Sequence, residues 1–247
     1  MVVIQDVTSG PLKSAYVDDC AGPVIFEYAK EELEKEGYEI INCEENAFLR
    51  IQEGKDAFIS QRGNMTKEGF LYFVNSVFLV RNSPALYTPE ETYWPERNTR
   101  RGFGFNRENK SSAVLVERAL EESIEIPYNK LKIYHDDWGV SERYCSKSIP
   151  TNKFIEDEVA SFVFGSQAEK YGYFLEELGV RKIFLVLFRK EFITNLRDDT
   201  ECIFVSSKQL FLQGLEGLSF DVGREHASKV CGVASFCRSL YRGVRYD

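Results

Sequence analysis

The run Val180-Arg-Lys-Ile-Phe-Leu-Val-Leu-Phe188 is the longest nearly uninterrupted series of β-branched, aromatic and aliphatic residues in the chain. A run this short and this apolar is typical of a strand that is buried on both faces of a sheet. Gly179 precedes it directly and separates it from the residues before it. We therefore predict a β-strand over residues 180–188, at the centre of a sheet in the C-terminal part of the chain.

Two predicted helices lead into this strand. Asn152–Phe164 carries apolar residues at helical spacing, and Ser166-Gln-Ala-Glu169 has the pattern of a capping box that opens a second helix. The second helix ends at Gly179, and Gly172 inside it indicates a close contact with another element. A helix that is followed by a glycine and a strand is the second half of a βαβ unit, for which Leu131–His135 is the candidate first strand.

Residues 1–82 predict one helix followed by short strands. Pro23–Glu36 has Ile25, Ala29 and Leu33 at intervals of four residues, and Gly37 ends the helix. Glu53-Gly54 is a plausible hairpin turn. The last two predicted strands form either a hairpin or one long strand. The pattern indicates an antiparallel meander packed on the helix, with strands at 38–43, 47–52, 56–61, 70–74 and 77–81.

The predicted fold class is α+β, or mixed α/β. An antiparallel part spans residues 1–82, an irregular connection spans 83–109, and a mixed sheet with flanking helices spans 110–247. The pattern leaves open whether the two outer parts form one continuous domain. Further elements of the last part are predicted as helices at 112–123 and 224–242 and strands at 201–206 and 219–222.

Composition and charge are those of a globular chain. The sequence has 247 residues, of which 43% are hydrophobic and 28% charged, and its formal net charge is −8. The negative charge argues against non-specific attraction to a nucleic-acid backbone, which requires an excess of Lys and Arg. A nucleic-acid partner is therefore not favoured, although a local basic face is compatible with the composition.

Sequence signals for export, membrane insertion and zinc binding are missing. The longest apolar runs fall short of the roughly 18–20 residues that span a bilayer, and Met1–Asp6 lacks the features of a secretory signal. The six cysteines are scattered without a Cys-x-x-Cys pair, and His135 and His226 are the two histidines. We therefore expect no zinc site, no membrane partner, and a cytoplasmic protein with reduced thiols.

The pattern that most clearly indicates a functional site is Trp94-Pro-Glu-Arg-Asn-Thr-Arg-Arg-Gly-Phe-Gly-Phe105, within the irregular connection. Its arginines provide planar groups that bind phosphate or carboxylate, its aromatic residues provide stacking faces, and its glycines allow close approach of a ligand. The alternative is a connection held by aromatic anchors whose arginines pair with acidic residues of the same chain. The candidate substrate-binding residues are Trp94, Arg97, Arg100, Arg101 and Phe103.

A second candidate is His135-Asp-Asp-Trp138, at the end of a predicted strand. An imidazole with nearby carboxylates suits acid/base chemistry or a divalent metal such as Mg²⁺. If the strand continues, His135 and Asp137 share a face; if it ends at His135, Asp136 can join them. We predict His135 and Asp137 as catalytic residues and Asp136 and Asp137 as metal ligands. A turn with an Asp cap fits the same residues.

One resemblance to a known family covers about 50 residues of the chain. Phe26-Glu-Tyr-Ala-Lys-Glu-Glu-Leu-Glu-Lys-Glu-Gly-Tyr-Glu-Ile40 resembles the opening helix and strand of the restriction-endonuclease-like PD-(D/E)XK nucleases. The resemblance implies a metal-binding Asp on the next strand, where Asp56 stands, and a Glu-x-Lys on the strand after it. Phe70–Ser76 contains neither Glu nor Lys, so the implied fold is a degenerate, nucleic-acid-binding one.

Three function hypotheses follow. In the first, the protein is a cytosolic enzyme, for example a hydrolase, that acts on a phosphate-bearing or otherwise anionic substrate in a cleft between the two parts. In the second, it is a non-catalytic subunit that docks a protein partner through residues 94–105, because arginine and aromatic residues are the usual interface anchors. In the third, it is the degenerate nuclease-like nucleic-acid-binding protein.

Overall fold

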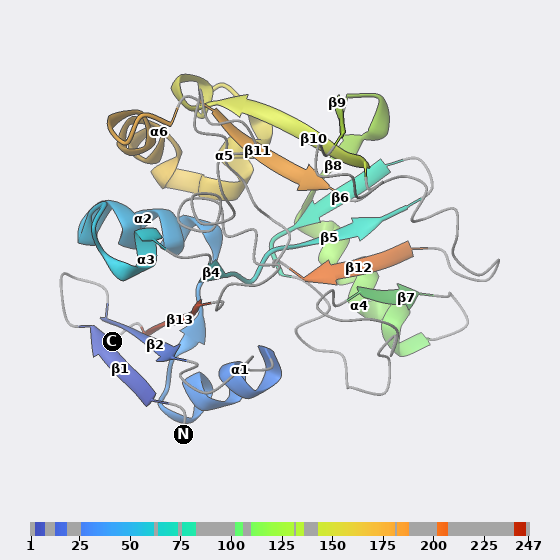
Figure 1. The fold of residues 1–247 in the computed structure, drawn as a ribbon. Coiled ribbons are helices and arrows are strands. Elements are labelled where there is room, and N and C mark those ends of the chain that lie inside the picture. Colours follow the sequence, from blue (N-terminus) through green and yellow to red (C-terminus); the bar gives the residue numbers. More distant parts are fainter. Residues whose placement is uncertain are drawn as a thin grey trace. The chain divides into compact units, whose positions relative to one another are not determined.

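The fold of the chain is α+β, which confirms the predicted class (Figure 1). A computed structural model describes residues 3–7, 13–18, 26–61, 64–73, 76–82, 102–105, 110–130, 132–135, 143–180, 182–187, 202–206 and 240–245. It forms two compact units: residues 1–66, 149–183 and 212–247 make unit 1, and residues 67–148 and 184–211 make unit 2. Among the described residues, none of the helices has the length and apolar character needed to cross a bilayer.

Unit 1 contains a sheet that brings the two ends of the chain together. Its strand order is β1 (Val3–Val7), β2 (Lys13–Asp18), β13 (Leu240–Arg245) and β3 (Glu39–Ile40), with β4 (Asn64–Met65) parallel to β13. Gly243 lies opposite Ala15 on one side and Ile40 on the other. The predicted helix is α1 (Phe26–Lys35), which contacts β2, β3 and β13 and buries Leu33 completely.

The rest of unit 1 is mainly helical. α2 (Cys43–Glu53) contacts the short α3 (Phe58–Gln61) and also α5 (Glu158–Phe164) and α6 (Ala168–Glu177). Two 3-10 turns, η4 (Thr151–Lys153) and η5 (Gly165–Gln167), join these elements. Ile41, Leu49 and Ile59 form a buried cluster between α2 and α3.

The strands predicted at 47–52 and 56–61 are wrong, because the first segment is part of α2 and the second includes α3. The helix begins at a capping box: the Glu45 N–H donates to Asn42 Oδ1 (2.8 Å), and the Asn42 N–H donates to Glu45 Oε2 (2.7 Å). Two otherwise unpaired donors are thereby satisfied. Gly54, at φ +87°, ends the helix instead of turning a hairpin.

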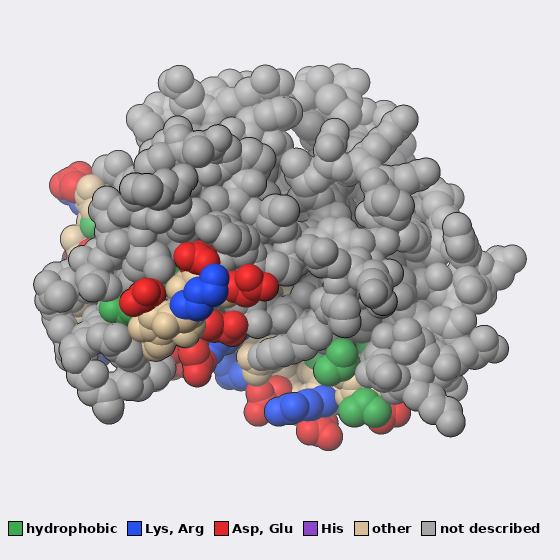
Figure 2. All heavy atoms as spheres, turned by 90° about the horizontal axis from the view of Figure 1, so that it is seen from below, with side chains coloured by type: hydrophobic (Ala, Val, Ile, Leu, Met, Phe, Trp, Pro, Cys, Tyr) green, Lys and Arg blue, Asp and Glu red, His purple; other side chains and the backbone are tan. Residues whose placement is uncertain are grey.

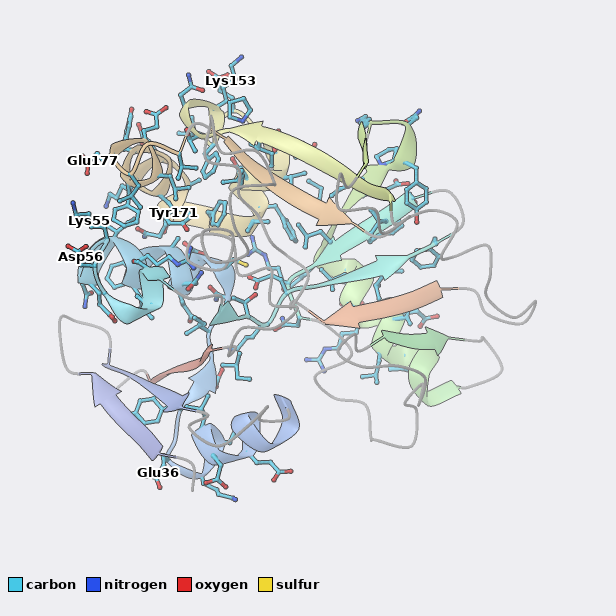
Figure 3. The ribbon with its side chains drawn as sticks, in the orientation of Figure 1. Glu36, Lys55, Asp56, Lys153, Tyr171 and Glu177 are labelled. Atoms are coloured by element: carbon cyan, nitrogen blue, oxygen red, sulfur yellow. The ribbon has the colours of Figure 1, made fainter. Side chains whose placement is uncertain are left out.

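The nuclease resemblance depends on Asp56, which lies in the turn between α2 and α3 (Figure 3). The family pattern requires this carboxylate on a strand that follows the opening helix and strand. Here α2 stands in that place. The structure therefore corrects the assignment of Asp56 as the first metal-binding position.

Unit 2 contains an antiparallel sheet with strand order β7 (Gly102–Phe105), β12 (Cys202–Ser206), β5 (Gly69–Tyr72), β6 (Ser76–Val80) and β8 (Ser123–Pro127). β5 and β6 form the predicted hairpin, and β12 matches the predicted strand at 201–206. α4 (Lys110–Glu121) packs Val116 and Ala119 against Leu71 and Val80. Val77 and its strand neighbour Leu79 point to the other face and are also fully buried.

The run at 180–188 forms β11 (Lys182–Leu187), as predicted. It is at one end of a three-stranded sheet with order β11, β10 (Arg143–Pro150) and β9 (Lys132–His135), so the central position is wrong. β10 was not predicted, and it stands between the other two strands in the chain and in the sheet. β9, the predicted first strand, pairs antiparallel with β10, and β10 and β11 run in opposite directions (Figure 1), so β9 and β11 are parallel. Because β10 stands between them, the helices before β11 follow β10 and not β9, and the predicted βαβ unit is not formed.

Three predicted helix boundaries also change. The helix at 152–164 is divided into η4 and α5, and Asp157 caps α5 by accepting from the N–H groups of Val159 (2.9 Å) and Ala160 (3.1 Å). Ser166 does not cap α6, because its hydroxyl donates to Glu44 Oε1 instead (2.6 Å). Residues 240–242 of the predicted closing helix belong to β13, and its other residues lie outside the described part of the chain.

Gly172 makes the close contact that its position in the helix predicted. A Cβ atom added at this position would lie 2.5 Å from the carbonyl oxygen of Thr151 in η4. The obstacle is backbone, which cannot rotate away as a side chain can. α6 and η4 therefore pack at a distance that only glycine allows.

We expect Gly172→Ala to lower the free energy of unfolding. Overpacking costs about 1–3 kcal/mol, whereas alanine gains about 1 kcal/mol of helix propensity over glycine, so the net effect is destabilising. Urea unfolding measures it, with Lys170→Ala on the exposed side of the same helix as the control. A Gly172→Ala protein as stable as the wild type would contradict the close packing of α6 on η4.

Candidate functional site

Most of the predicted site residues fall outside the described part of the chain: Trp94, Arg97, Arg100, Arg101, Asp136 and Asp137. His135 is the last residue of β9, opposite Arg143 of β10, and Phe103 is in β7. For these two, the structure gives the backbone position. The convergence of the candidate residues on one site stays a prediction.

The strand register of unit 2 defines where the segment with the candidate arginines joins the sheet. Gly102, the first residue of β7, lies opposite Val205 near the end of β12. Ser206, the last residue of β12, lies opposite Gly69, the first residue of β5, which in turn lies opposite Val80 at the end of β6. These positions share one end of the sheet, the end at which β7 begins.

Two basic residues lie beside this end of the sheet, which we call the basic sheet end: Lys67, two residues before β5, and Arg81, directly after β6. Both are half-buried. Acidic residues lie here as well: Glu68 is buried, and the carbonyl of Glu122, directly before β8, accepts from the Arg81 N–H (3.2 Å). Arg101 directly precedes β7 in the sequence and lies outside the described residues.

Phe103 is placed by its backbone pairing. It lies opposite Phe204 of β12, and Phe204 lies opposite Leu71 of β5. The predicted role of its side chain in ligand contact stays a prediction.

The proposed metal site has no test in the described residues. Within them, no group of three or more His, Cys, Asp or Glu residues is arranged to hold a metal ion. Asp136 and Asp137 lie outside this part of the chain, and His135 is placed through its backbone alone. The predicted Mg²⁺ site therefore stays a prediction.

Two polar contacts of unit 1 join residues more than a hundred positions apart, and the sequence patterns did not predict them. Nη1 of Arg50 in α2 donates to the hydroxyl of Tyr171 in α6 at 2.9 Å, and both residues are buried (Figure 3). Glu44 accepts from the N–H (2.8 Å) and hydroxyl (2.6 Å) of Ser166. The Asn42–Glu45 capping box was the available sequence signal, because it marks the start of α2.

An aromatic cluster surrounds the Tyr171 contact. The ring centroids of Phe154 and Phe164 are 5.3 Å apart, and those of Phe164 and Tyr171 are 4.9 Å apart. Phe174 stacks on Tyr171 from within α6. The arrangement is a packed core with one charged hydrogen bond, so its chemistry is structural.

A further contact connects this core to the strand at 180–188. The hydroxyl of Thr151 donates to the carbonyl of Val180 at 3.1 Å, and both residues are buried. Thr151 follows β10 directly, and Val180 precedes β11. This hydrogen bond thus connects the start of the helical segment, which follows β10, to its end, which comes before β11.

The surface of α1 is mainly acidic. Figure 2 shows acidic side chains on one face of the molecule, and among the described side chains Glu31 and Glu34 of α1 and Glu36 directly after it are exposed, with Lys35 beside them. Lys35 Nζ is paired with Glu32. This surface accounts for part of the net charge of −8 and contrasts in sign with the basic sheet end.

We expect Tyr171→Phe to lower the free energy of unfolding by about 1.5–3 kcal/mol, the usual contribution of a hydrogen bond to a charged group. Tyr173→Phe is the matched control, because its hydroxyl contacts Glu169 on the exposed side of α6. Urea unfolding of both variants provides the comparison. Equal effects of the two substitutions would contradict a structural role for the Arg50–Tyr171 bond.

Comparisons with known proteins bear on the fold. No protein-family model matches the sequence, and no curated protein matches it. A solved structure, described in work on the accommodation of massive sequence variation in Nanoarchaeota by the C-type lectin fold, is similar to this chain. The TM-score is 0.52 at 14% sequence identity, over 96% of this chain and 99% of the other. The chain therefore has a fold similar to the C-type lectin fold.

Proposed function

We propose that this protein is a non-catalytic binding protein that recognises a partner through the segment 94–105. The observation that carries the proposal is the similarity to a C-type lectin fold along nearly the whole chain. The similar protein is described as a fold that accommodates massive sequence variation. A scaffold that tolerates variable surface residues suits recognition of a partner, in which changes of contact residues change the ligand.

The attachment of the segment to the sheet supports this proposal. All four residues of β7 pair with β12, and β12 is itself paired with β5 on its other edge. The end of the segment is thus held by a strand within a sheet whose central residues are buried, for example Leu71 and Val77. Binding segments that a rigid scaffold positions lose less conformational freedom when they bind.

The composition of the segment supports partner contact as well. Arg97, Arg100 and Arg101 provide donors for carboxylate, phosphate or sulfate, and Trp94 provides a large apolar surface.

The enzyme hypothesis, with His135 and Asp137 as acid/base pair, stays a prediction, because the described residues give it neither support nor contradiction.

We also infer a cytoplasmic location. Cys43 is a buried thiol outside any disulfide and lies 3.4 Å from the Thr66 hydroxyl, which supports the use of cysteine as a small apolar residue.

Binding of the full chain to a glycan array and a peptide array tests the proposal. We expect the wild type to bind a defined set of spots and the triple variant Arg97→Ala, Arg100→Ala, Arg101→Ala to lose at least about tenfold in affinity, since each buried charged contact contributes about 1.5–3 kcal/mol. The melting temperature should stay unchanged.

The matched control is Lys55→Ala, Lys130→Ala, Lys153→Ala, which removes the same charge at three exposed positions. This variant should bind as the wild type does. A wild-type protein that binds nothing on either array, or a triple arginine variant that binds normally, would contradict the proposed function.

A further inference from the structure

We propose that Ser166 is a phosphorylation site and that its phosphate opens the contact between η5 and the first turn of α2. Ser166 is exposed in η5, the short turn between α5 and α6, where a protein kinase can reach its hydroxyl. The inference is independent of the proposed function, because Ser166 belongs to unit 1 and the segment 94–105 belongs to unit 2.

The modification replaces a hydrogen-bond donor with an anion. A kinase transfers the γ-phosphoryl group of a nucleoside triphosphate to Ser166 Oγ: the new O–P bond forms, the bond to the nucleoside diphosphate breaks, and the hydroxyl proton is released. The phosphate that results carries a charge of about −1.5 to −2 at neutral pH, and its oxygens are strong acceptors.

Glu44 makes this change repulsive. Its Oε1 accepts from the Ser166 hydroxyl (2.6 Å) and from the Ser166 N–H (2.8 Å). The hydroxyl bond is lost on phosphorylation, and a carboxylate and a phosphate then face each other across the same contact. The Gln167 amide, whose Nε2 donates to Ser166 Oγ (3.1 Å), is neutral and does not cancel this charge.

The backbone of the turn prevents Glu44 from relieving the repulsion in place. Gly165 has φ +50°, and a Cβ atom added there would overlap Glu44 Oε2 and lie 2.7 Å from Oε1. The carboxylate therefore lies directly against the turn and must leave it when a phosphate is added. The rest of α2 stays in place, because Arg50 near its other end is held by the Tyr171 hydroxyl.

The start of α6 gives the phosphate a second favourable position. Ser166-Gln-Ala-Glu169 has the pattern of a capping box, yet the N-cap residue Gln167 makes no side-chain bond to the first turn of α6. Negative charge is favoured near the N-terminus of a helix. Glu44 and the start of α6 thus compete for the group on Ser166, and phosphorylation shifts the preference toward α6.

Mass spectrometry of the full chain purified from its own cells tests whether the site is used. We expect phosphate on Ser166 and none on Ser161, whose half-buried hydroxyl donates to the backbone carbonyl of Phe154 (3.1 Å). A Ser166 peptide that is recovered without phosphate from both growing and starved cells overturns the proposal.

Hydrogen exchange of the full chain measures the opening. With phosphoserine at position 166, the protection of the residue 166 amide should fall about tenfold, because its bond to a charged acceptor is lost. Ser166→Asp tests the same effect with a smaller charge. Glu44→Gln should restore most of the protection, because the neutral amide can accept from the N–H and donate to the phosphate. Glu169→Gln, which removes an exposed carboxylate of α6, is the matched control and should restore none.

The outcomes of the exchange experiment are distinct. Equal protection in the phosphorylated and unmodified chains overturns the opening of the contact. Failure of Glu44→Gln to restore protection, or equal restoration by Glu169→Gln, overturns the role of Glu44. Restoration by Glu44→Gln alone supports the proposal.

Discussion

The sheet of unit 2 depends on the pairing of β12 with two strands that come much earlier in the chain. Cys202–Ser206 pairs with residues of β7 on one edge and of β5 on the other. Without this strand, β7 would have no partner among the described strands, and the segment before it would have no fixed point of attachment. A pairing between residues about a hundred positions apart thus determines where the arginine-bearing segment ends.

Local sequence patterns predicted those helices and strands whose formation depends mainly on their own residues. The β5–β6 hairpin, the strand at 202–206 and the closeness of Gly172 to a neighbour followed from alternation, apolar runs and a glycine inside a helix. α2 was predicted as a strand because its apolar residues were read in short groups, although the Asn42–Glu45 box marks a helix start. Ser166 shows the opposite error, since its box pattern was overridden by the tertiary contact with Glu44.

The arrangement of strands could not be predicted from the sequence, because it depends on contacts between distant residues. β10 has polar residues in its middle and lacks the apolar run that marks β11, yet it separates β11 from β9. The same applies to the candidate site. The sequence indicated the arginines, but the neighbourhood of Lys67 and Arg81 became visible only through the register of β5, β6, β12 and β7.

The position of β13 has a consequence for how the chain folds. This strand, at residues 240–245, lies between β2 and β3, whose residues come from the first 40 of the chain. During synthesis, the edges of β2 and β3 that pair with β13 remain without this partner until residues 41–239 have also been synthesised. Contacts with such large sequence separation close late and slowly, and strand edges that wait for a partner are prone to aggregate. Unit 1 is therefore the part of the molecule for which chaperone assistance during synthesis matters most.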